Sequence, residues 1–331
     1  MRTRGLTDLQ VNGFAGVDFN DAELTDHALD HALAAMRTTG VRLCLPTLIT
    51  ASESDLAARF AALDRAVANS RLGPAMVPGY HLEGPFLNSS RASAGCHPPE
   101  AMIAADQALI TRLEANLRRP ILLITLAPET PGAIACIRAL RARGKLVALG
   151  HTMASAADIA AAAATGANLS THLGNALSAP IHKFDNPLTA QLAEDSLTAS
   201  FIADGIHIPP AALQIFLRAK TLARTILVTD ATAAAAAPPG VYRFASMEIV
   251  RAPDGSVRTP GGTTLAGSAL TLDQAVRNLV TWGLATPTQA IALATATPAA
   301  LLAPALAAHA IAADPGWISW DNILNPHDSG T

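Results

Sequence analysis

The sequence predicts an α/β protein with a (β/α)8 barrel, and three observations support this fold class. Short β-branched or apolar runs alternate with alanine-rich helical stretches, which is the pattern of βα units around a parallel sheet. Eight such runs are present, and a barrel of this kind has eight strands. Hydrophobic residues make up 50% of the 331 residues but aromatic residues only 4%, which favours many small-residue helices over an aromatic-rich β structure.

The predicted elements follow one another along the chain and are separated by Gly, Pro and polar turn signals. We expect strands at Asp8–Val11, Val41–Pro46, Ala75–Leu82, Ile121–Leu126, Leu146–Leu149, Asn168–Thr171, Thr198–Ile202 and Thr225–Val228. We expect intervening helices at Leu24–Thr38, Glu53–Ala68, Pro99–Leu117, Pro131–Arg141, Ser155–Ala164, Leu188–Glu194 and Pro209–Ala219.

The chain after the eighth strand adds one excursion and then returns to the helical pattern. Residues 241–257 alternate as VYRFASMEIV and carry an Asp254-Gly255 turn signal, which predicts a β-hairpin. Ser268–Trp282 and Thr286–Ala294 are predicted to complete the outer ring of helices. We therefore expect one barrel domain over residues 1–302 and an irregular tail over residues 303–331.

Composition points to a small-molecule ligand in a reducing compartment. The formal net charge is −3 and there is no Lys/Arg block, so we expect neither nucleic acid nor an anionic membrane as partner. Cys44, Cys96 and Cys136 lie far apart and form no CxxC pair, so they are expected to be reduced thiols. No signal-peptide pattern and no window of about 18 apolar residues is recognised, so we expect a cytoplasmic protein.

Unusual polar residues stand at the carboxyl ends of the predicted strands, where a barrel gathers its functional side chains. Glu83, His151, His172 and Asp230 each end a strand, and His207 follows another. Taken alone, each has an ordinary interpretation, such as a hydrogen-bonded core histidine, a loop-capping carboxylate or a helix N-cap. Five of them after five different strands favour a common site.

The residue types in this set match a hydrolytic metal centre. Two imidazoles and one carboxylate, here His151, His172 and Glu83, leave a fourth position open for water. The sequence therefore predicts one divalent ion per subunit, with Zn²⁺ as the first candidate and Fe²⁺, Co²⁺ or Mn²⁺ as alternatives. A cation would also explain why a strand that looks buried ends in the carboxylate of Glu83.

Three further segments carry weaker signals. Asn175 and Ala176 follow His172 closely enough to place an amide over a substrate, although Asn in a loop is usually turn chemistry. His97 lies in a loop that is long for a βα connection and is a candidate functional flap. The Gly-rich run 261–268 before a helix could bind an anion or be a plain turn.

Ten motifs in the same order along almost the whole chain resemble the N-acetylglucosamine-6-phosphate deacetylases of the amidohydrolase superfamily. They are DLQVNGFAGVDFND, LPTLIT, HLEGPF, TLAPE, LGHT, THLGNA, ADGIH, VTDA, LAGSALTLDQAVRNLV and ATATPAALL. The resemblance implies a metal-dependent hydrolase barrel with Glu83, His151 and His172 on the metal and Asp230 as general acid–base. It also implies that His97 polarises the acetyl carbonyl. Sugar-phosphate contacts from Asn175, Ala176 and His207, and a pocket wall from Leu265, complete the implied site.

The chain departs from the family pattern in three places. Gln10-Val11-Asn12 replaces the HxH of many amidohydrolases and resembles the members that use one metal. The Arg-Glu pair that family members present to the sugar phosphate is missing, and Lys183 or His182 is the nearest substitute. Only seven residues precede Asp8 and the tail lacks a clear strand set, so we expect the family's accessory β-sandwich to be reduced or absent.

The implied function is hydrolysis of the acetamido group of N-acetylglucosamine 6-phosphate, in amino-sugar catabolism, by a homodimer. Two alternatives stay open at this point. One is a deacetylase of a related sugar, either N-acetylgalactosamine 6-phosphate or an unphosphorylated acetamido sugar, which the missing Arg favours. The other is a non-catalytic sugar-binding barrel, against which the intact Glu83, His151, His172 and Asp230 argue.

Overall fold

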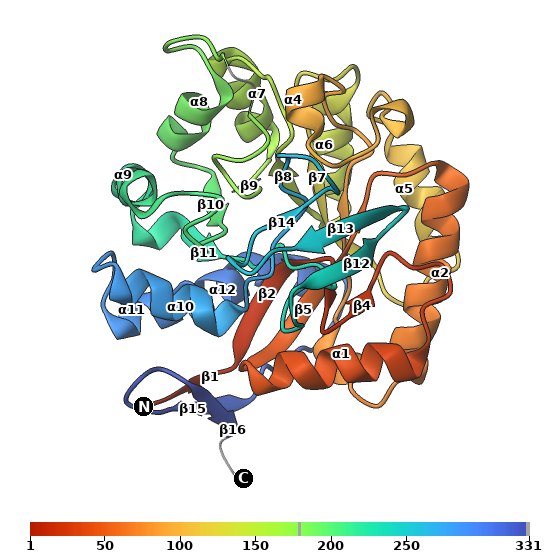
Figure 1. The fold of residues 1–331 in the computed structure, drawn as a ribbon. Helices are drawn as coiled ribbons and strands as arrows, with labels where there is room; N and C mark the ends of the chain where they lie inside the picture. The colour runs from red at the N-terminus through yellow and green to blue at the C-terminus, as the bar shows by residue number, and fades with distance from the viewer. Residues whose placement is uncertain (178–179, 329–331) are drawn as a thin grey trace.

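An eight-stranded parallel sheet forms the centre of the computed structural model, which describes residues 1–177 and 180–328 (Figure 1). The strand order β11-β10-β9-β8-β7-β6-β5-β2 follows the chain in one direction around the sheet. This confirms the predicted (β/α)8 barrel. The strands are β2 (Leu6–Val11), β5 (Val41–Ile49), β6 (Tyr80–Glu83), β7 (Ile121–Leu126), β8 (Leu146–Leu149), β9 (Leu169–Ser170), β10 (Thr198–Phe201) and β11 (Thr225–Leu227).

The barrel closes where the end of β2 meets the segment after β11. The amide of Asp230 donates to the carbonyl of Gln10 at 2.9 Å, and the amide of Asn12 donates to the carbonyl of Ala231 at 2.7 Å. Just below, the fully buried Asp8 accepts hydrogen bonds from the hydroxyl and amide of Thr229 at 2.5 and 3.2 Å. This seam therefore fixes the position of Asp230 relative to the first strand.

Helices between and after the strands cover the outside of the barrel (Figure 1). Several bury an apolar stripe, as α1 does with Leu29, Leu33 and Met36. Side-chain caps begin several of them, and α7 starts with a reciprocal capping box between Ser155 and Asp158. The helices are α1 (Asp26–Thr38), α2 (Glu53–Asn69), α5 (Gln107–Glu114), α6 (Ala133–Ala142), α7 (Ala156–Thr165), α8 (Pro187–Ala193), α9 (Pro210–Lys220), α10 (Leu272–Thr281), α11 (Pro287–Ala292) and α12 (Ala296–Ala308).

Two predicted elements were too long. The expected strand Ala75–Leu82 begins instead with the short helix α3 (Gly73–Met76), because Pro74 suits a first helical turn, and β6 starts only after Pro78-Gly79. The expected helix Pro99–Leu117 divides into the 3₁₀ turn η1 (Pro99–Ala101) and α5, whose N-terminus is capped by the Asp106 side chain. Short helical turns also form at α4 (Arg91–Ala94) and η2 (Leu222–Arg224).

The predicted hairpin is present and lies over the barrel mouth. We call residues 240–258 the mouth hairpin; it contains β12 (Gly240–Phe244), β13 (Met247–Arg251) and β14 (Val257–Arg258). Its side chains Phe244, Ile249 and Val257 pack on Ile49 at the end of β5. A second small hairpin, β3 (Gly13–Phe14) and β4 (Val17–Asp18), ends in Asp18, which accepts a hydrogen bond from the amide of Ala245 at 2.6 Å.

The two ends of the chain form a small sheet of their own. β1 (Arg2–Arg4) pairs antiparallel with β15 (Trp317–Trp320), which pairs with β16 (Pro326–Asp328). The expectation of an irregular tail was wrong for this segment, and α12 also extends into it; residues 329–331 lie outside the described residues. This three-stranded sheet lies outside the barrel, at the chain ends where the sequence predicts a reduced or absent β-sandwich.

One stretch, Pro287–Ala308, is long and apolar enough to cross a membrane, contrary to the expectation from the sequence. In the structure it divides into α11 and α12, and 44% of its most apolar window is buried inside the protein. Contacts of α12 with β2 and β11 place it against the barrel, as for a core helix.

Candidate active site

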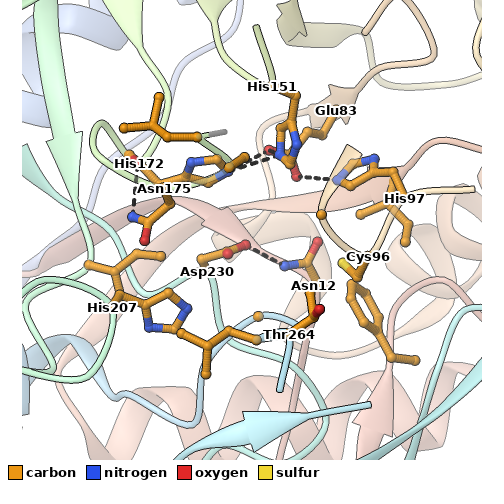
Figure 2. A pocket seen from close by; sticks show the side chains of 18 of the residues that line it. Asn12, Glu83, Cys96, His97, His151, His172, Asn175, His207, Asp230 and Thr264 are labelled. Carbon is orange, nitrogen blue, oxygen red and sulfur yellow. Dashed lines mark hydrogen bonds and ion pairs between the residues drawn. The ribbon is translucent and has the colours of Figure 1, made fainter. Parts of the chain in front are cut away.

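A cavity of about 330 Å³ opens at the carboxyl ends of the strands, beneath the mouth hairpin (Figure 2). Lysine and arginine are absent from the described residues that line it. Of the residues predicted from the sequence, it brings together Glu83, His97, His151, His172, Asn175, Ala176, His207, Asp230 and Leu265. The predicted Lys183 lies outside it.

Glu83 stands at the centre of a ring of nitrogen atoms, although its side chain is only 2% exposed. Its Oε1 lies 3.0 Å from Nε2 of His172 and 3.3 Å from Nε2 of His151. Its Oε2 lies 3.6 Å from Nε2 of His97. Burial alone would raise the pKa of Glu83, but its contacts with the three imidazoles, where a ring donates a proton to the carboxylate, hold the pKa well below the ordinary value.

Hydrogen bonds on the far side of two rings determine which nitrogen faces Glu83. Nδ1 of His151 lies 2.7 Å from the carbonyl of Ser93, which can only accept, so Nδ1 carries the proton. The Thr50 hydroxyl donates to the carbonyl of Glu83 at 3.1 Å, so it accepts from Nδ1 of His97 at 2.9 Å. In the neutral imidazoles, both Nε2 atoms therefore present lone pairs to the carboxylate.

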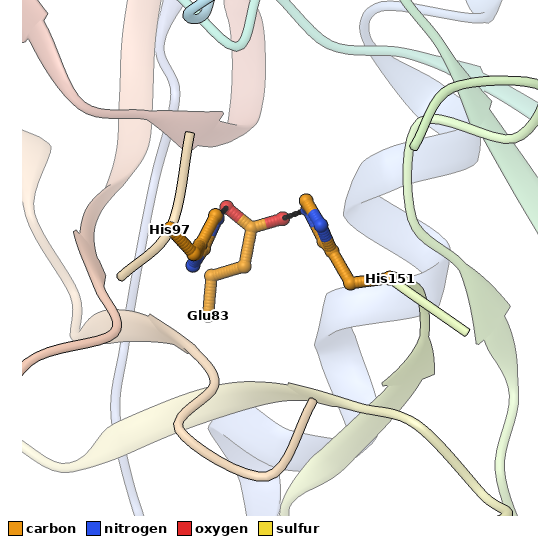
Figure 3. Close-up of side chains that lie close together, drawn as sticks. All are labelled: Glu83, His97 and His151. Carbon is orange, nitrogen blue, oxygen red and sulfur yellow. Dashed lines mark ion pairs between the residues drawn. The ribbon is translucent and has the colours of Figure 1, made fainter. Parts of the chain in front are cut away.

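With neutral rings, this arrangement fits a cation. Lone pairs and a carboxylate repel one another at these distances, and the Nε2 atoms of His151 and His172 are themselves only 3.2 Å apart. Glu83, His97 and His151 offer ligand atoms that all lie within 4.8 Å of one another (Figure 3). The donor set of imidazole nitrogens and a carboxylate oxygen suits a divalent metal ion.

The backbone aims these side chains into the mouth by an uncommon conformation. His151, His172 and Asp230, each just beyond a strand end, have positive φ values of 51°, 29° and 49°. Non-glycine residues adopt this region at a cost, and such strain is concentrated at functional sites. Each strand end thus turns sharply enough to direct its polar side chain inward.

The side-chain amides of Gln10 in β2 and of Asn12 just after it belong to the site. The sequence predicts these two residues only as replacements for metal ligands. Nε2 of Gln10 donates to Oε1 of Glu83 at 3.0 Å, and Nδ2 of Asn12 donates to Oδ1 of Asp230 at 2.8 Å. The alternation of QVN on a barrel strand was the signal that could have found them. Burial, and secondly the charge of Glu83, raise the pKa of Asp230 to about 6.

His207 is positioned by a partner that the sequence reasoning also missed. Its Nδ1 lies 2.6 Å from Oδ2 of Asp204, three residues earlier in the same loop. Burial alone would raise the pKa of Asp204, but bonds from the His207 ring and from the amides of His207 and Ile206 hold it below its ordinary value. The Asp204 carboxylate thus orients the His207 ring, which lines the cavity.

The loop that carries Lys183 lies on the surface. Lys183 is exposed and its Nζ lies 5.2 Å from the ring centroid of the exposed Phe184. Asp185 accepts from the amide of Ala156 at the start of α7, and Nδ1 of His182 accepts from the amide of Asp185. The Gly-rich run contributes Thr263, Thr264, Leu265 and Gly267 to the cavity wall, but α10 begins only at Leu272, so it does not open that helix directly.

Comparison with known proteins relates most of the chain to one group of enzymes. It is 36% identical over 297 residues to an N-acetylgalactosamine-6-phosphate deacetylase of Escherichia coli O157:H7, covering 89% of this chain and 76% of the relative. It is 32% identical over 277 residues to the N-acetylglucosamine-6-phosphate deacetylase of Bacillus subtilis (strain 168), covering 83% and 68% of the two chains. No family model matches the sequence.

A solved structure agrees with these relatives. A mutant of the N-acetyl-D-glucosamine-6-phosphate deacetylase from Mycobacterium smegmatis, in complex with N-acetyl-D-glucosamine-6-phosphate, superposes with a TM-score of 0.87 at 30% identity. The match covers 98% of this chain and 84% of that structure. With the barrel, the histidine-carboxylate cluster and these relatives in agreement, the chain belongs to the family of N-acetylglucosamine-6-phosphate and N-acetylgalactosamine-6-phosphate deacetylases.

Proposed function

We propose that this protein hydrolyses the acetamido group of N-acetylglucosamine 6-phosphate to glucosamine 6-phosphate and acetate, as a step of amino-sugar catabolism. The observation that carries the proposal is the cluster of Glu83, His151 and His172 beside Asp230 in one cavity. A metal-ligand set next to a carboxylate that can move a proton is the arrangement that hydrolysis of an amide requires.

The metal proposal assigns Glu83, His151 and His172 as ligands of one divalent ion, with Zn²⁺ as the first candidate. The lone pair that Nε2 of His151 presents to Glu83 supports this assignment, and Nε2 of His172 lies 3.0 Å from the same carboxylate oxygen. When bound, such an ion supplies a Lewis acid that lowers the pKa of water to about 7. Gln10 and Asn12 occupy the positions where a second metal would need histidines, which supports a single ion.

Asp230 moves the proton in the proposed reaction. Its carboxylate, held at Oδ1 by the Asn12 amide, takes the proton from the attacking water and returns it to the amide nitrogen of the sugar. The new bond joins water oxygen to the acetyl carbon, and the broken bond is that between the acetyl carbon and nitrogen. Acetate and a sugar amine leave, with atoms and protons in balance.

His97 has two proposed roles, which the metal content of a variant distinguishes. The family resemblance assigns it to polarisation of the acetyl carbonyl, which stabilises the developing oxyanion. The bond from its Nδ1 to Thr50 leaves Nε2 of the neutral ring without a proton, which also suits a metal ligand. If His97→Ala keeps a full equivalent of metal but loses turnover, the first role holds.

We propose that the wall of the cavity that follows β9 and β10 binds the sugar phosphate. Asn175 and Ala176 after β9 and His207 after β10 line that wall, and Leu265 adds an apolar contact. His207, oriented by Asp204, can donate to a phosphate oxygen when it is protonated. The cavity lining that the structure describes contains no Lys or Arg, so Lys183 must approach from the loop or from another subunit of a homodimer.

The second candidate is the galactosamine epimer, because an N-acetylgalactosamine-6-phosphate deacetylase is 36% identical to this chain. Unphosphorylated acetamido sugars are the third, because the described lining has no Lys or Arg. In each case we infer a small-molecule substrate and a cytoplasmic enzyme.

Acetate release, measured for both epimers with and without the 6-phosphate, tests the function. We expect the highest kcat/KM for N-acetylglucosamine 6-phosphate. Release from none of the four sugars by metal-loaded protein would support the non-catalytic alternative and contradict the proposal.

Lys183→Ala tests the phosphate contact in the same assay. We expect KM for the phosphorylated sugar to rise by the loss of one charge-assisted hydrogen bond, about 1.5–3 kcal/mol, with little change for the unphosphorylated sugar. Lys183 contacts Phe184, so Phe184→Ala is the matched control for the loop itself. Equal kcat/KM values for the two sugars in all proteins would remove phosphate recognition but leave the deacetylase proposal in place.

A further inference from the structure

One wall of the cavity is apolar and has no part in the chemistry described above. Ile49, Cys96 and Phe244 all line the cavity, and they belong to one cluster of packed side chains, which we call the acyl wall. Ile49 and Phe244 are 1% and 2% exposed, so both side chains are buried against their neighbours. The polar lining residues named above do not explain why it is apolar.

The acyl wall and the sugar-binding wall lie on opposite sides of the barrel. Ile49 ends β5, whereas Asn175 and Ala176 follow β9, four strands away in a ring of eight. His207 follows the next strand, β10. Figure 2 shows the same arrangement, with Cys96 on one side, Asn175 and His207 on the other, and Asp230 between them.

Amide geometry then decides which part of the substrate meets the acyl wall. A secondary amide is planar and trans, so the carbon on nitrogen and the carbon on the carbonyl point to opposite ends of the C–N bond. With the carbonyl oxygen toward the Glu83 cluster and the nitrogen toward Asp230, a sugar held at Asn175 and His207 directs its acyl group to the other end. That end is formed by Ile49, Cys96 and Phe244.

We propose that Ile49, Cys96 and Phe244 form an acyl-binding pocket that restricts the enzyme to short N-acyl groups. This inference rests on the proposed deacetylase function and specifies its substrate class. An apolar wall favours a methyl group over water and gives no hydrogen bond to a polar acyl chain. The pocket accepts acetyl and excludes longer chains because its side chains are already packed.

The mouth hairpin holds this pocket closed. Phe244 ends β12, and its ring is backed by Ile249 and Val257 of the same hairpin. The amide of the next residue, Ala245, is bound to the Asp18 carboxylate at 2.6 Å. An acyl chain longer than acetyl can therefore enter only by displacing the whole hairpin.

The test compares hydrolysis of N-acetyl, N-propanoyl and N-butanoyl glucosamine 6-phosphate, measured as release of the sugar amine. For wild type we expect kcat/KM to fall about 10- to 200-fold for one added methylene. Phe244→Ala opens the wall and should raise the butanoyl-to-acetyl ratio of kcat/KM at least tenfold. A folded Phe244→Ala protein, verified by circular dichroism, with the wild-type ratio would overturn the proposal.

Leu177→Ala is the matched control, because Leu177 lines the same cavity but follows β9 on the sugar side. It also removes apolar volume, and we expect the acyl-length ratio to stay at the wild-type value whatever happens to the rate itself. An equal gain in the ratio from Leu177→Ala would mean that any enlargement of the cavity admits longer chains, and would overturn the assignment to the acyl wall.

Three further outcomes are distinguishable. If Phe244→Ala does not fold, Cys96→Ala, which removes only a sulfur atom, must raise the propanoyl-to-acetyl ratio about tenfold, and an unchanged ratio rejects the pocket. If metal-loaded wild type cleaves none of the three sugars, the proposed function itself fails. Equal wild-type rates on all three sugars would retain the deacetylase and reject the acyl wall.

Discussion

At the residue scale, a small set of hydrogen bonds holds Glu83 and the histidine rings around it in place. Gln10 holds one carboxylate oxygen at 3.0 Å, and Ser93 and Thr50 fix the tautomers of His151 and His97 from behind. Because these supporting bonds come from other segments, each ring presents its Nε2 atom without needing to reorganise. The cluster is therefore preorganised for a cation.

The metal assignment predicts the behaviour of single histidine variants. Wild type should contain about one divalent ion per chain, and His151→Ala or His172→Ala should lose both the ion and activity because a ligand is removed. His207→Ala is the matched control, since its Nδ1 is bound to Asp204, and it should keep the ion. Elemental analysis decides this; full metal content in either ligand variant, or two tightly bound ions in wild type, contradicts the assignment.

The role of Asp230 predicts a loss of turnover without loss of metal. Asp230→Asn keeps the shape of the side chain and removes the basic oxygen, so turnover should fall by about 100-fold or more. Substrate binding, measured by calorimetry with the metal-loaded variant, should survive. Asn12→Ala should have a smaller effect in the same direction, because it frees Oδ1 of Asp230 without removing the carboxylate. A near-normal rate in Asp230→Asn would move the proton-transfer role to another group.

At the scale of elements, the mouth hairpin is fastened by one buried carboxylate. Asp18 accepts hydrogen bonds from the amides of Asn20 and Ala245 at 2.9 and 2.6 Å. Burial outweighs these bonds and raises the pKa of Asp18 from 3.8 to about 6, with Asp21 raising and Arg59 lowering it as smaller contributions. Burying the ionised Asp18 carboxylate that holds the hairpin therefore costs free energy, and this cost depends on pH.

This predicts that the Asp18 contribution to stability falls as pH rises from about 4 to about 6. The native state binds the Asp18 proton more tightly than the unfolded state, so it holds more protons throughout that window. The advantage is fully present below about pH 4 and is lost above about pH 6, a change on the order of 3 kcal/mol. Urea unfolding of wild type and Asp18→Asn should show their stability difference shifting by this amount.

The exposed Glu23 lies on the same loop, and Glu23→Gln is the control that should retain the wild-type pH profile. A difference between wild type and Asp18→Asn that stays constant from pH 4 to pH 7 would show that Asp18 does not couple the hairpin to pH.

At the scale of the whole molecule, the small terminal sheet joins the two ends of the chain to the barrel. Ile318 of β15 is fully buried, and Pro326 of β16 lies against Gly40, between α1 and β5. Arg42 at the start of β5 also pairs with Asp328. The sheet therefore covers the side of the barrel near the start of β5, away from the mouth (Figure 1).

We expect Ile318→Ala to lower the free energy of unfolding by about 2–5 kcal/mol, since it leaves a cavity beneath the sheet. Ile323→Ala, at a position 72% exposed in the same tail, should change it by no more than about 0.5 kcal/mol. Metal content and kcat should stay at wild-type values in both, because neither residue lines the active site. Equal stability losses for the two variants would show that the terminal sheet is not packed as described.

The amino-acid sequence by itself determined the eight-stranded barrel and the set of polar residues at its mouth. Both follow from local information: apolar periodicity and turn chemistry predict strands and helices, and the carboxyl ends of parallel strands must share one mouth. Glu83, His151, His172 and Asp230 could be selected in this way because each stands at the carboxyl end of a strand or within three residues of it. Errors such as Pro99–Leu117 arose where a cap, here Asp106, outweighed helical pattern.

The tertiary structure alone decided how these residues are held and what closes the cavity. The bond from His151 to Ser93 spans 58 residues, that from Ala245 to Asp18 spans 227, and β1 pairs with β15 from the other end of the chain. Periodicity carries no information about such partners, because they are brought together only when the barrel closes and the hairpin folds over it. For the same physical reason, the acyl wall of Ile49, Cys96 and Phe244 exists only in the folded protein.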